Sequence, residues 1–372
     1  MMPLISQLLQ QDSELGMIIQ TLFSLAFIVY IFYAQRLQTL QMLRQVEVTL
    51  RKVKSIRDEG RETAIKTINE LGKPEKDISA EVDRFMDHFV ISPIDMDPAG
   101  VVGKLKQILD TREDVWEYEV KNIAPNASEN ERNNIENLLE ASMALNIYYK
   151  VVRHYYLLGK KTMNIYVIMQ IHMVLPLLMM EIEAYASALQ AFQEGMPIGD
   201  SVGAIVAGKL MHGYPNKEVA KEMVAAEVPF EGRTLIVMKA RGPGGSVGEP
   251  GEAIKNVLDK KKGKVKIIIT VDAAGKLEGE AVGSVAEGVG AAIGGPGVDK
   301  YQMEETAKKY NVPLHAVAIK EGIEHVVSPL VDPLFDGVDK AVEAVKRIVL
   351  NYTQEGDTVL IAGIGNTVGV AQ

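Results

Sequence analysis

The segment VKIIITVDAAG, residues 265–275, is a run of mostly β-branched apolar residues that ends in an aspartate and a glycine. Similar apolar runs recur at TLIVMK (234–239), LHAVAI (314–319) and DTVLIA (357–362). Helical patterns separate these runs, at about 250–262, 299–310 and 335–352. Continuous apolar strands that alternate with helices are typical of a parallel sheet covered on both faces. We therefore expect residues 232–372 to form a Rossmann-like α/β domain built on a parallel sheet.

The composition limits the classes of function that the chain can have. It has 372 residues, of which 47% are hydrophobic, so it is long and apolar enough to bury a core. It contains no cysteine, which excludes disulfides, thiol nucleophiles and zinc–thiolate sites. Its formal net charge of −9 argues against general nucleic-acid binding, which needs a dense positive surface.

The N-terminal segment GMIIQTLFSLAFIVYIFY (16–33) contains no charged residue. With one residue on each side it gives about 20 residues, or roughly 30 Å of helix, which matches the hydrocarbon core of a bilayer. A cleaved signal peptide would need a basic start and a small-residue cleavage site, and neither is present. We expect residues 15–34 to form a transmembrane helix in the cell membrane.

The charges on either side of this segment predict its orientation. Acidic residues precede it, whereas five basic residues follow it between 36 and 54. Because positive residues stay on the cytoplasmic side, we expect a short extracytoplasmic tail at 1–14 and a cytoplasmic location for the rest of a single-pass chain.

A second apolar run, MNIYVIMQIHMVLPLLMM (163–180), allows two interpretations. The flanking charges permit another crossing, which would move the C-terminal domain to the other side of the membrane. Its polar residues and Pro176 count against a crossing, because each polar group needs a partner in lipid. We expect a buried helix, in which His172 is a hydrogen-bonded core residue.

The middle of the chain is helical in pattern. Residues 35–72 form a juxtamembrane helix whose Leu43, Val46, Leu50 and Val53 follow 3-4-3 spacing. This spacing fits a short coiled-coil seam, or equally an amphipathic helix that packs on its own domain. Residues 73–231 are expected to form a helical domain, with Ser128 and Glu131 as a capping box.

Two further helix starts are predicted in this region. Asp97 and Pro98 follow a turn-rich segment and would cap and begin a helix. Asp200 would cap the helix that follows it, in which small residues at 203–208 would allow a close contact within the protein or between subunits.

The main functional signal lies in the loops that follow the four predicted strands. Each is richer in glycine or charge than a plain connection needs: ARGPGGSVGEPG (240–251), DAAGKLEGEAVGSVAEG (272–288), KEGIEHVVSP (320–329) and GIGNTVGV (363–370). Ligands of open parallel sheets bind beyond the carboxyl ends of the strands. We therefore expect these loops to face one pocket.

The first and last loops are candidates for holding a phosphate. Glycine permits close approach of backbone N–H groups, and the helix that begins near Pro250 favours an anion at its N-terminus. The first loop matches neither a Walker loop nor a spaced G-x-G-x-x-G, so a sharp turn without a ligand stays an alternative. The predicted ligand-binding residues are Gly242, Gly244, Gly245, Ser246, Gly363, Gly365, Asn366 and Thr367.

The second loop concentrates carboxylates directly after a strand. Asp272, Glu278 and Glu280 are predicted to hold Mg²⁺ together with a phosphorylated ligand, and the alternative is a solvated charged loop. In the third loop, His325 lies near Glu321 and Glu324 and could act as an acid, a base or a ligand.

A hydrolase is a second hypothesis. The order of strand, GPGGS, helix and strand is similar to that of membrane-associated serine proteases of the Clp or signal-peptide-peptidase type. That resemblance implies oxyanion donors at Gly244 and Gly245, a nucleophile at Ser284 and a base such as Lys276. The acidic stretch before Ser284 and the later strands depart from the family plan.

The glycine-rich segments GPGGSVGEPG, VDAAGKLEGEAVGSVAEGVGAAIGGPGVDK and GIGNT together resemble an uncharacterised family of archaeal membrane proteins, described as a domain of unknown function. The likeness covers almost the whole chain, including the N-terminal anchor. It implies an archaeal source and a membrane location, but no activity, catalytic residue or cofactor.

The sequence as a whole therefore predicts a single-pass, membrane-anchored homo-oligomer whose cytoplasmic α/β domain binds a small phosphorylated ligand or nucleotide, with Mg²⁺. The other hypotheses are a membrane-associated hydrolase, either a peptidase or a phosphoesterase, and a purely structural membrane assembly.

Overall fold

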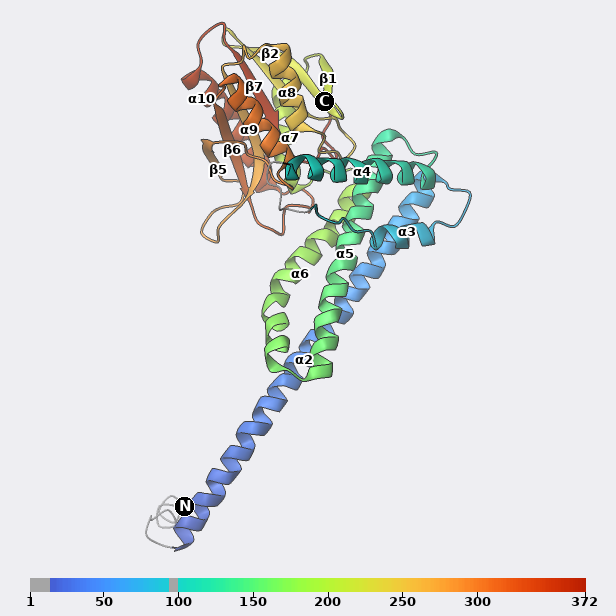
Figure 1. Cartoon of the computed structure of the whole chain (residues 1–372), viewed down its shortest axis with the longest axis vertical. Coiled ribbons are helices and arrows are strands. Elements are labelled where there is room, and N and C mark those ends of the chain that lie inside the picture. Colours follow the sequence, from blue (N-terminus) through green and yellow to red (C-terminus); the bar gives the residue numbers. More distant parts are fainter. Residues whose placement is uncertain (1–13, 94–99) are drawn as a thin grey trace. The chain divides into compact units, whose positions relative to one another are not determined.

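The computed structural model describes residues 14–93 and 100–372 (Figure 1). The predicted tail before residue 14 and the predicted helix start at Asp97 and Pro98 lie outside the described residues. The chain divides into two compact units, which are residues 1–55 with 148–179, and residues 56–147 with 180–372.

The first unit is helical. It consists of parts of α2 (Glu14–Gly72), α5 (Glu129–Thr162) and α6 (Ile165–Glu194). Its core joins one face of each helix: Met42, Leu43, Val46, Val152, Tyr156, Ile168, Ile171 and Leu175. The predicted 3-4-3 stripe on α2 therefore packs against helices of the same chain, which is the amphipathic alternative.

Within the residues that the structure describes, two helices are long and apolar enough to cross a membrane. The first is Gly16–Gly72, whose most apolar window is not buried at all. The second is Ile165–Glu194, and here the prediction of a buried helix is only partly correct, because Tyr166, Met173 and Leu177 are 70%, 69% and 58% exposed. One side of this helix packs on α2 and α5, and His172 is half-buried with Nε2 2.6 Å from Gln45 Oε1.

The second unit begins with helices that lead to the sheet. They are the end of α2, α3 (Ser79–Met86), α4 (Val101–Ile123), the start of α5, the end of α6, the 3-10 turn η1 (Gly199–Ser201) and α7 (Val202–Met211). The predicted capping box at the start of α5 is confirmed. The Ser128 backbone N–H donates to Glu131 Oε2 at 2.7 Å, and the Glu131 N–H donates to Ser128 Oγ at 3.4 Å.

A seven-stranded mixed sheet forms the centre of the C-terminal half. Its strands are β1 (Asn216–Ala220), β2 (Met223–Phe230), β3 (Arg233–Ala240), β4 (Ile267–Gly275), β5 (Val285–Val289), β6 (Leu314–Glu321) and β7 (Thr358–Gly363). The strand order is β1-β2-β3-β7-β4-β6-β5. The four neighbouring strands β3, β7, β4 and β6 pair in parallel, whereas β1, β2 and β5 pair with their neighbours in the antiparallel direction.

The four predicted strands are thus confirmed as the parallel centre of the sheet, but the sheet is not parallel throughout. Strands β1 and β2 lie within residues assigned to the helical region, and β5 lies within a predicted loop. A Rossmann-like arrangement is not confirmed, because β7 lies between β3 and β4, unlike the 3-2-1-4-5-6 strand order of that fold.

Helices cover both faces of the sheet, as the continuous apolar strands require (Figure 1). Alternate residues of the strands pack with α7 and α10 (Asp332–Tyr352) on one face. The remaining residues pack with α8 (Pro250–Lys260) and α9 (Val298–Tyr310) on the other.

Helix α7 approaches the sheet closely enough for backbone to meet backbone. A Cβ atom on Gly203 would lie 2.3 Å from the carbonyl oxygens of Val271 and Ile364. A Cβ on Gly363 would lie 2.2 Å from the Gly203 carbonyl oxygen. The small-residue face of α7 therefore serves a contact inside the domain.

This contact gives the first testable prediction. Gly203→Ala should lower the free energy of unfolding by roughly 1–3 kcal/mol, because the added methyl group meets backbone atoms that cannot move aside cheaply. Urea denaturation of the full chain in detergent measures the change.

The matched control is Gly103→Ala in α4, where nothing lies within 4 Å of the added Cβ. That substitution should leave stability unchanged or raise it slightly, since alanine favours helix. Equal stability of the two variants would contradict the close contact.

Candidate functional site

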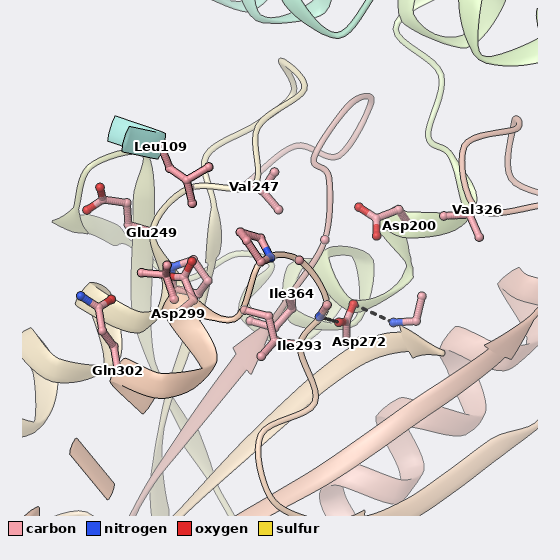
Figure 2. A pocket seen from close by; sticks show the side chains of 18 of the residues that line it. Leu109, Asp200, Val247, Glu249, Asp272, Ile293, Asp299, Gln302, Val326 and Ile364 are labelled. Atoms are coloured by element: carbon pink, nitrogen blue, oxygen red, sulfur yellow. Dashed lines mark hydrogen bonds between the residues drawn. The ribbon is translucent and has the colours of Figure 1, made fainter. Parts of the chain in front are cut away.

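A cavity of about 410 Å³ lies at the carboxyl ends of the parallel strands (Figure 2). All four predicted loops contribute to its lining. Residues 247–250 follow β3, residues 272–275 end β4, Glu321 ends β6 and Val326 follows it, and Ile364 and Gly365 follow β7. The loops that the sequence singled out thus meet at one place, where ligands of such sheets bind.

Besides the four loops, Asp200 in η1 and the start of α9, two further segments line this strand-end cavity. Helix α4 contributes Lys106 and Leu109 among others, and the segment before α9 contributes residues 293–296. Lys106 Nζ lies 3.2 Å from Glu249 Oε1, so an ion pair joins α4 to the loop after β3. Neither wall contains one of the predicted site residues.

The strand-end cavity is strongly acidic. One lysine, Lys106, stands against seven carboxyl side chains: Asp110, Glu113, Asp200, Glu249, Asp272, Asp299 and Glu321. A bare anion would be repelled here, whereas a cation, or an anion that arrives with a cation, would be attracted.

Asp272 lies in β4 and is 6% exposed. Its Oδ1 accepts the N–H of Ala273 at 2.8 Å, and its Oδ2 accepts the N–H of Gly294 at 3.1 Å. Burial, together with the nearby charge of Asp200, raises the pKa of the Asp272 carboxyl to about 7. This is the only one of the three predicted metal ligands that lines the cavity.

Asp200 and Glu321 join Asp272, although neither was in the predicted metal set. Asp200 Oδ2 accepts the N–H of Asn366 at 2.8 Å, and burial raises the pKa of Asp200. Glu321 is 2% exposed, and burial, with contributions from Asp200 and Asp272, raises the pKa of its carboxyl to about 8. Glu321 Oε2 has no hydrogen-bond partner in the described part of the chain.

Glu278 and Glu280 do not line the strand-end cavity. They lie beyond the end of β4, where Glu280 Oε2 accepts the Leu277 N–H at 2.7 Å, and this hydrogen bond lowers the pKa of Glu280. Among residues 14–93 and 100–372, no three histidine, aspartate or glutamate side chains are close enough to form a metal cage.

Two glycines of the first loop are hydrogen-bonded to helix α5. The N–H groups of Gly244 and Gly245 donate to Asn130 Oδ1 at 3.3 Å and to Asn134 Oδ1 at 2.9 Å. A Cβ on Gly242 would lie 1.9 Å from the Val370 carbonyl oxygen. The backbone donors expected to hold a phosphate are therefore used within the protein, which favours the turn alternative for residues 242–245.

The last loop is hydrogen-bonded to the first loop. Thr367 Oγ1 lies 2.8 Å from the Gly244 carbonyl oxygen and accepts the Ser246 N–H at 3.1 Å. The Asn366 amide donates to Asn137 Oδ1 at 2.7 Å. Of the eight predicted ligand-binding residues, only Gly365 lines the strand-end cavity.

Gly245 and Ser246 instead line a second cavity, of about 270 Å³, between α4 and α5. The two cavities are neighbours, because both are lined by Leu109, Glu113, Val247 and Gly248. We refer to the second one as the α4–α5 cavity.

The residues of the peptidase hypothesis do not line either of these cavities together. Ser284 pairs with Lys320 through its backbone, and neither Ser284 nor Lys276 lines the strand-end cavity or the α4–α5 cavity. His325, with Nδ1 3.3 Å from Glu324 Oε1, lines neither.

The fold and the cavity define a chain whose N-terminal half is helical, with a strongly apolar first helix, and whose C-terminal half is a mixed α/β domain with an acidic cavity. Residues 20–195 match the N-terminal domain of a protein of unknown function (DUF1512), and residues 198–371 match the C-terminal domain of unknown function of DUF1512. Together these matches cover almost the whole chain, which therefore belongs to the DUF1512 family. No curated protein and no solved structure matches it.

The raised pKa values give a prediction for stability. A buried carboxyl whose pKa is raised on folding binds its proton more tightly in the folded chain, so the free energy of unfolding should fall as pH rises from about 4 to about 8. Asp272→Asn and Glu321→Gln should each flatten this dependence, as measured by thermal unfolding across that pH range. A variant whose profile is as steep as that of the unmodified chain would contradict the assignment of that carboxyl.

Proposed function

We propose that this protein is anchored to a membrane by α2 and binds a small phosphorylated ligand, with Mg²⁺, in the strand-end cavity. The observation that carries the proposal is the meeting of all four strand-end loops at one acidic cavity. A plain connection needs neither this convergence nor the two buried carboxyl groups of Asp272 and Glu321 beside Asp200.

The acidity of the cavity supports a cation as part of the ligand. Asp272 and Glu321 are almost fully buried, and the proximity of Asp200 makes the charged forms of both unfavourable. A divalent cation would relieve this repulsion and displace their protons. Mg²⁺ usually keeps several waters and binds one or two carboxylates plus a phosphate, so it does not require an all-protein cage.

The N-termini of two helices favour the binding of a phosphate in this cavity. Pro250 begins α8 and Val298 begins α9, and both line the strand-end cavity. The partial positive charge of helix N-termini favours an anion nearby. In this proposal the carboxyl groups bind the cation, and the phosphate lies between that cation and the two helix ends.

Binding can be tested by thermal shift and calorimetry on the full chain in detergent. Inorganic phosphate, pyrophosphate, AMP, ADP and ATP should stabilise the protein only when Mg²⁺ is present, because the cavity repels the free anions. Asp272→Asn should abolish this shift, whereas Glu278→Gln, outside the cavity, should preserve it. Equal stabilisation with and without Mg²⁺, or none in either case, would contradict the proposal.

A phosphoesterase is the second candidate. The observation that favours it is the buried Glu321 carboxyl, whose Oε2 has no hydrogen-bond partner among the described residues and whose pKa burial raises to about 8, so in this candidate the cation binds Asp272 and Glu321 stays protonated. Such a group could donate a proton to a leaving oxygen. Release of inorganic phosphate from the bound compound, lost in Glu321→Gln, would distinguish this enzyme from a pure binding protein.

The membrane anchor and the homo-oligomer are supported by apolar surface. Leu22, Phe23 and Phe32 on α2 are at least 63% exposed, far more apolar surface than water tolerates on one helix. We propose that this segment crosses the bilayer once, with the α/β domain in the cytoplasm, and that exposed apolar residues of α6 join copies of the chain.

The anchor predicts how the protein partitions. The full chain should stay with membranes in alkaline carbonate, and a variant that lacks residues 1–35 should be released. Protease added to sealed cells should spare the C-terminal domain and digest it once the membrane is opened. Release of the full chain by carbonate would contradict the anchor, and digestion in sealed cells would contradict the orientation.

A further inference from the structure

The α4–α5 cavity differs in character from the strand-end cavity. Its lining includes three basic residues, Arg112, Arg132 and Lys221, among several glutamates, and it also includes the tryptophan Trp116. A lining of both charges suits a ligand that itself carries both charges.

Some of these charges are already used within the protein. Arg112 pairs with Glu140 and lies over the Trp116 ring, with its guanidinium carbon 4.9 Å from the ring centroid. Lys221 Nζ lies 3.1 Å from Glu113 Oε1. These pairs form the frame of the cavity and leave little charge for a ligand.

Arg132 and Glu136, in contrast, form no ion pair with any of the described residues. They are one helical turn apart on α5 and both line the cavity, yet no ion pair joins them in the described chain. The Arg132 guanidinium donates to the Ala127 carbonyl oxygen at 2.9 and 2.8 Å and pairs with no carboxylate of the described residues. Glu136 makes no hydrogen bond there, and burial raises the pKa of its carboxyl to about 8.

Trp116 supplies a third unused group. It is 1% exposed and packs edge-on against Phe85, with ring centroids 5.0 Å apart. Its Nε1 is buried and has no hydrogen-bond partner among the described residues. A buried indole N–H without an acceptor is costly, and a ligand oxygen would remove that cost.

We propose that the α4–α5 cavity is a binding site for a small zwitterion, namely a free α-amino acid. The ligand carboxylate pairs with Arg132 and accepts the Trp116 N–H, and the ligand ammonium group pairs with Glu136. The volume of about 270 Å³ suits a molecule of that size. This site does not depend on a phosphorylated ligand in the neighbouring strand-end cavity.

The test uses the fluorescence of Trp116, which is the only tryptophan in the chain. The full chain in detergent is titrated with each of the common amino acids at up to millimolar concentration. At least one should change the emission in a saturable way. The methyl ester of that amino acid lacks the carboxylate, its N-acetyl form lacks the ammonium group, and each should bind at least about tenfold more weakly.

Variants test the two charged contacts separately. Arg132→Gln and Glu136→Gln should each weaken binding at least about tenfold, while Arg153→Gln, exposed on the same helix, should not change it. Melting temperatures of the variants show whether they fold. The proposal is overturned if no amino acid changes the emission, or if the ester or the N-acetyl form binds as well as the parent compound.

Discussion

The packing of α7 on the centre of the sheet is the constraint on which the strand-end cavity depends. Two glycines, Gly203 and Gly363, let the backbone of the helix touch the backbone of β7. This contact brings the start of the helix, and with it Asp200, to the strand ends. There the N–H of Asn366 binds the Asp200 carboxylate. A larger residue at either glycine would push the helix, and Asp200, away from Asp272.

The resulting group of carboxyls is unfavourable for the folded chain by itself. Burial disfavours the charged forms of Asp200, Asp272 and Glu321. The charge of Asp200 adds to this effect at Asp272, and the charges of Asp200 and Asp272 add to it at Glu321. The backbone N–H groups that bind Asp272 offset only part of this effect. A group of buried carboxylates costs the folded chain less free energy when a bound ligand of opposite charge pairs with it.

The sequence predicted the elements whose pattern is local. The apolar runs of β3, β4, β6 and β7 stand out because both faces of these strands are buried. Strand β1 was missed because NKEVA is short and polar, and β5 because VAEGV is an exposed edge strand that contains glycine. Neither has the pattern of a strand covered on both faces.

The candidate site was predicted less completely, for a similar reason. Asp272 could be recognised because it follows a buried run directly along the chain. The contact between Asp200 and Asn366 joins residues 166 positions apart, and no spacing rule predicts such a contact. Glu278 and Glu280 satisfied the rule for carboxylates after a strand, but β4 continues to Gly275, and they lie beyond it.

The position of β7 has a consequence for how the domain is made. Of the seven strands of this sheet it is the last to be synthesised, yet it occupies the middle of the sheet, with β3 on one side and β4 on the other. Until residues 358–363 emerge, the two halves of the sheet lack the strand that joins them. The nascent domain therefore exposes unpaired apolar strand edges during synthesis, and such edges favour aggregation until the last pairing forms.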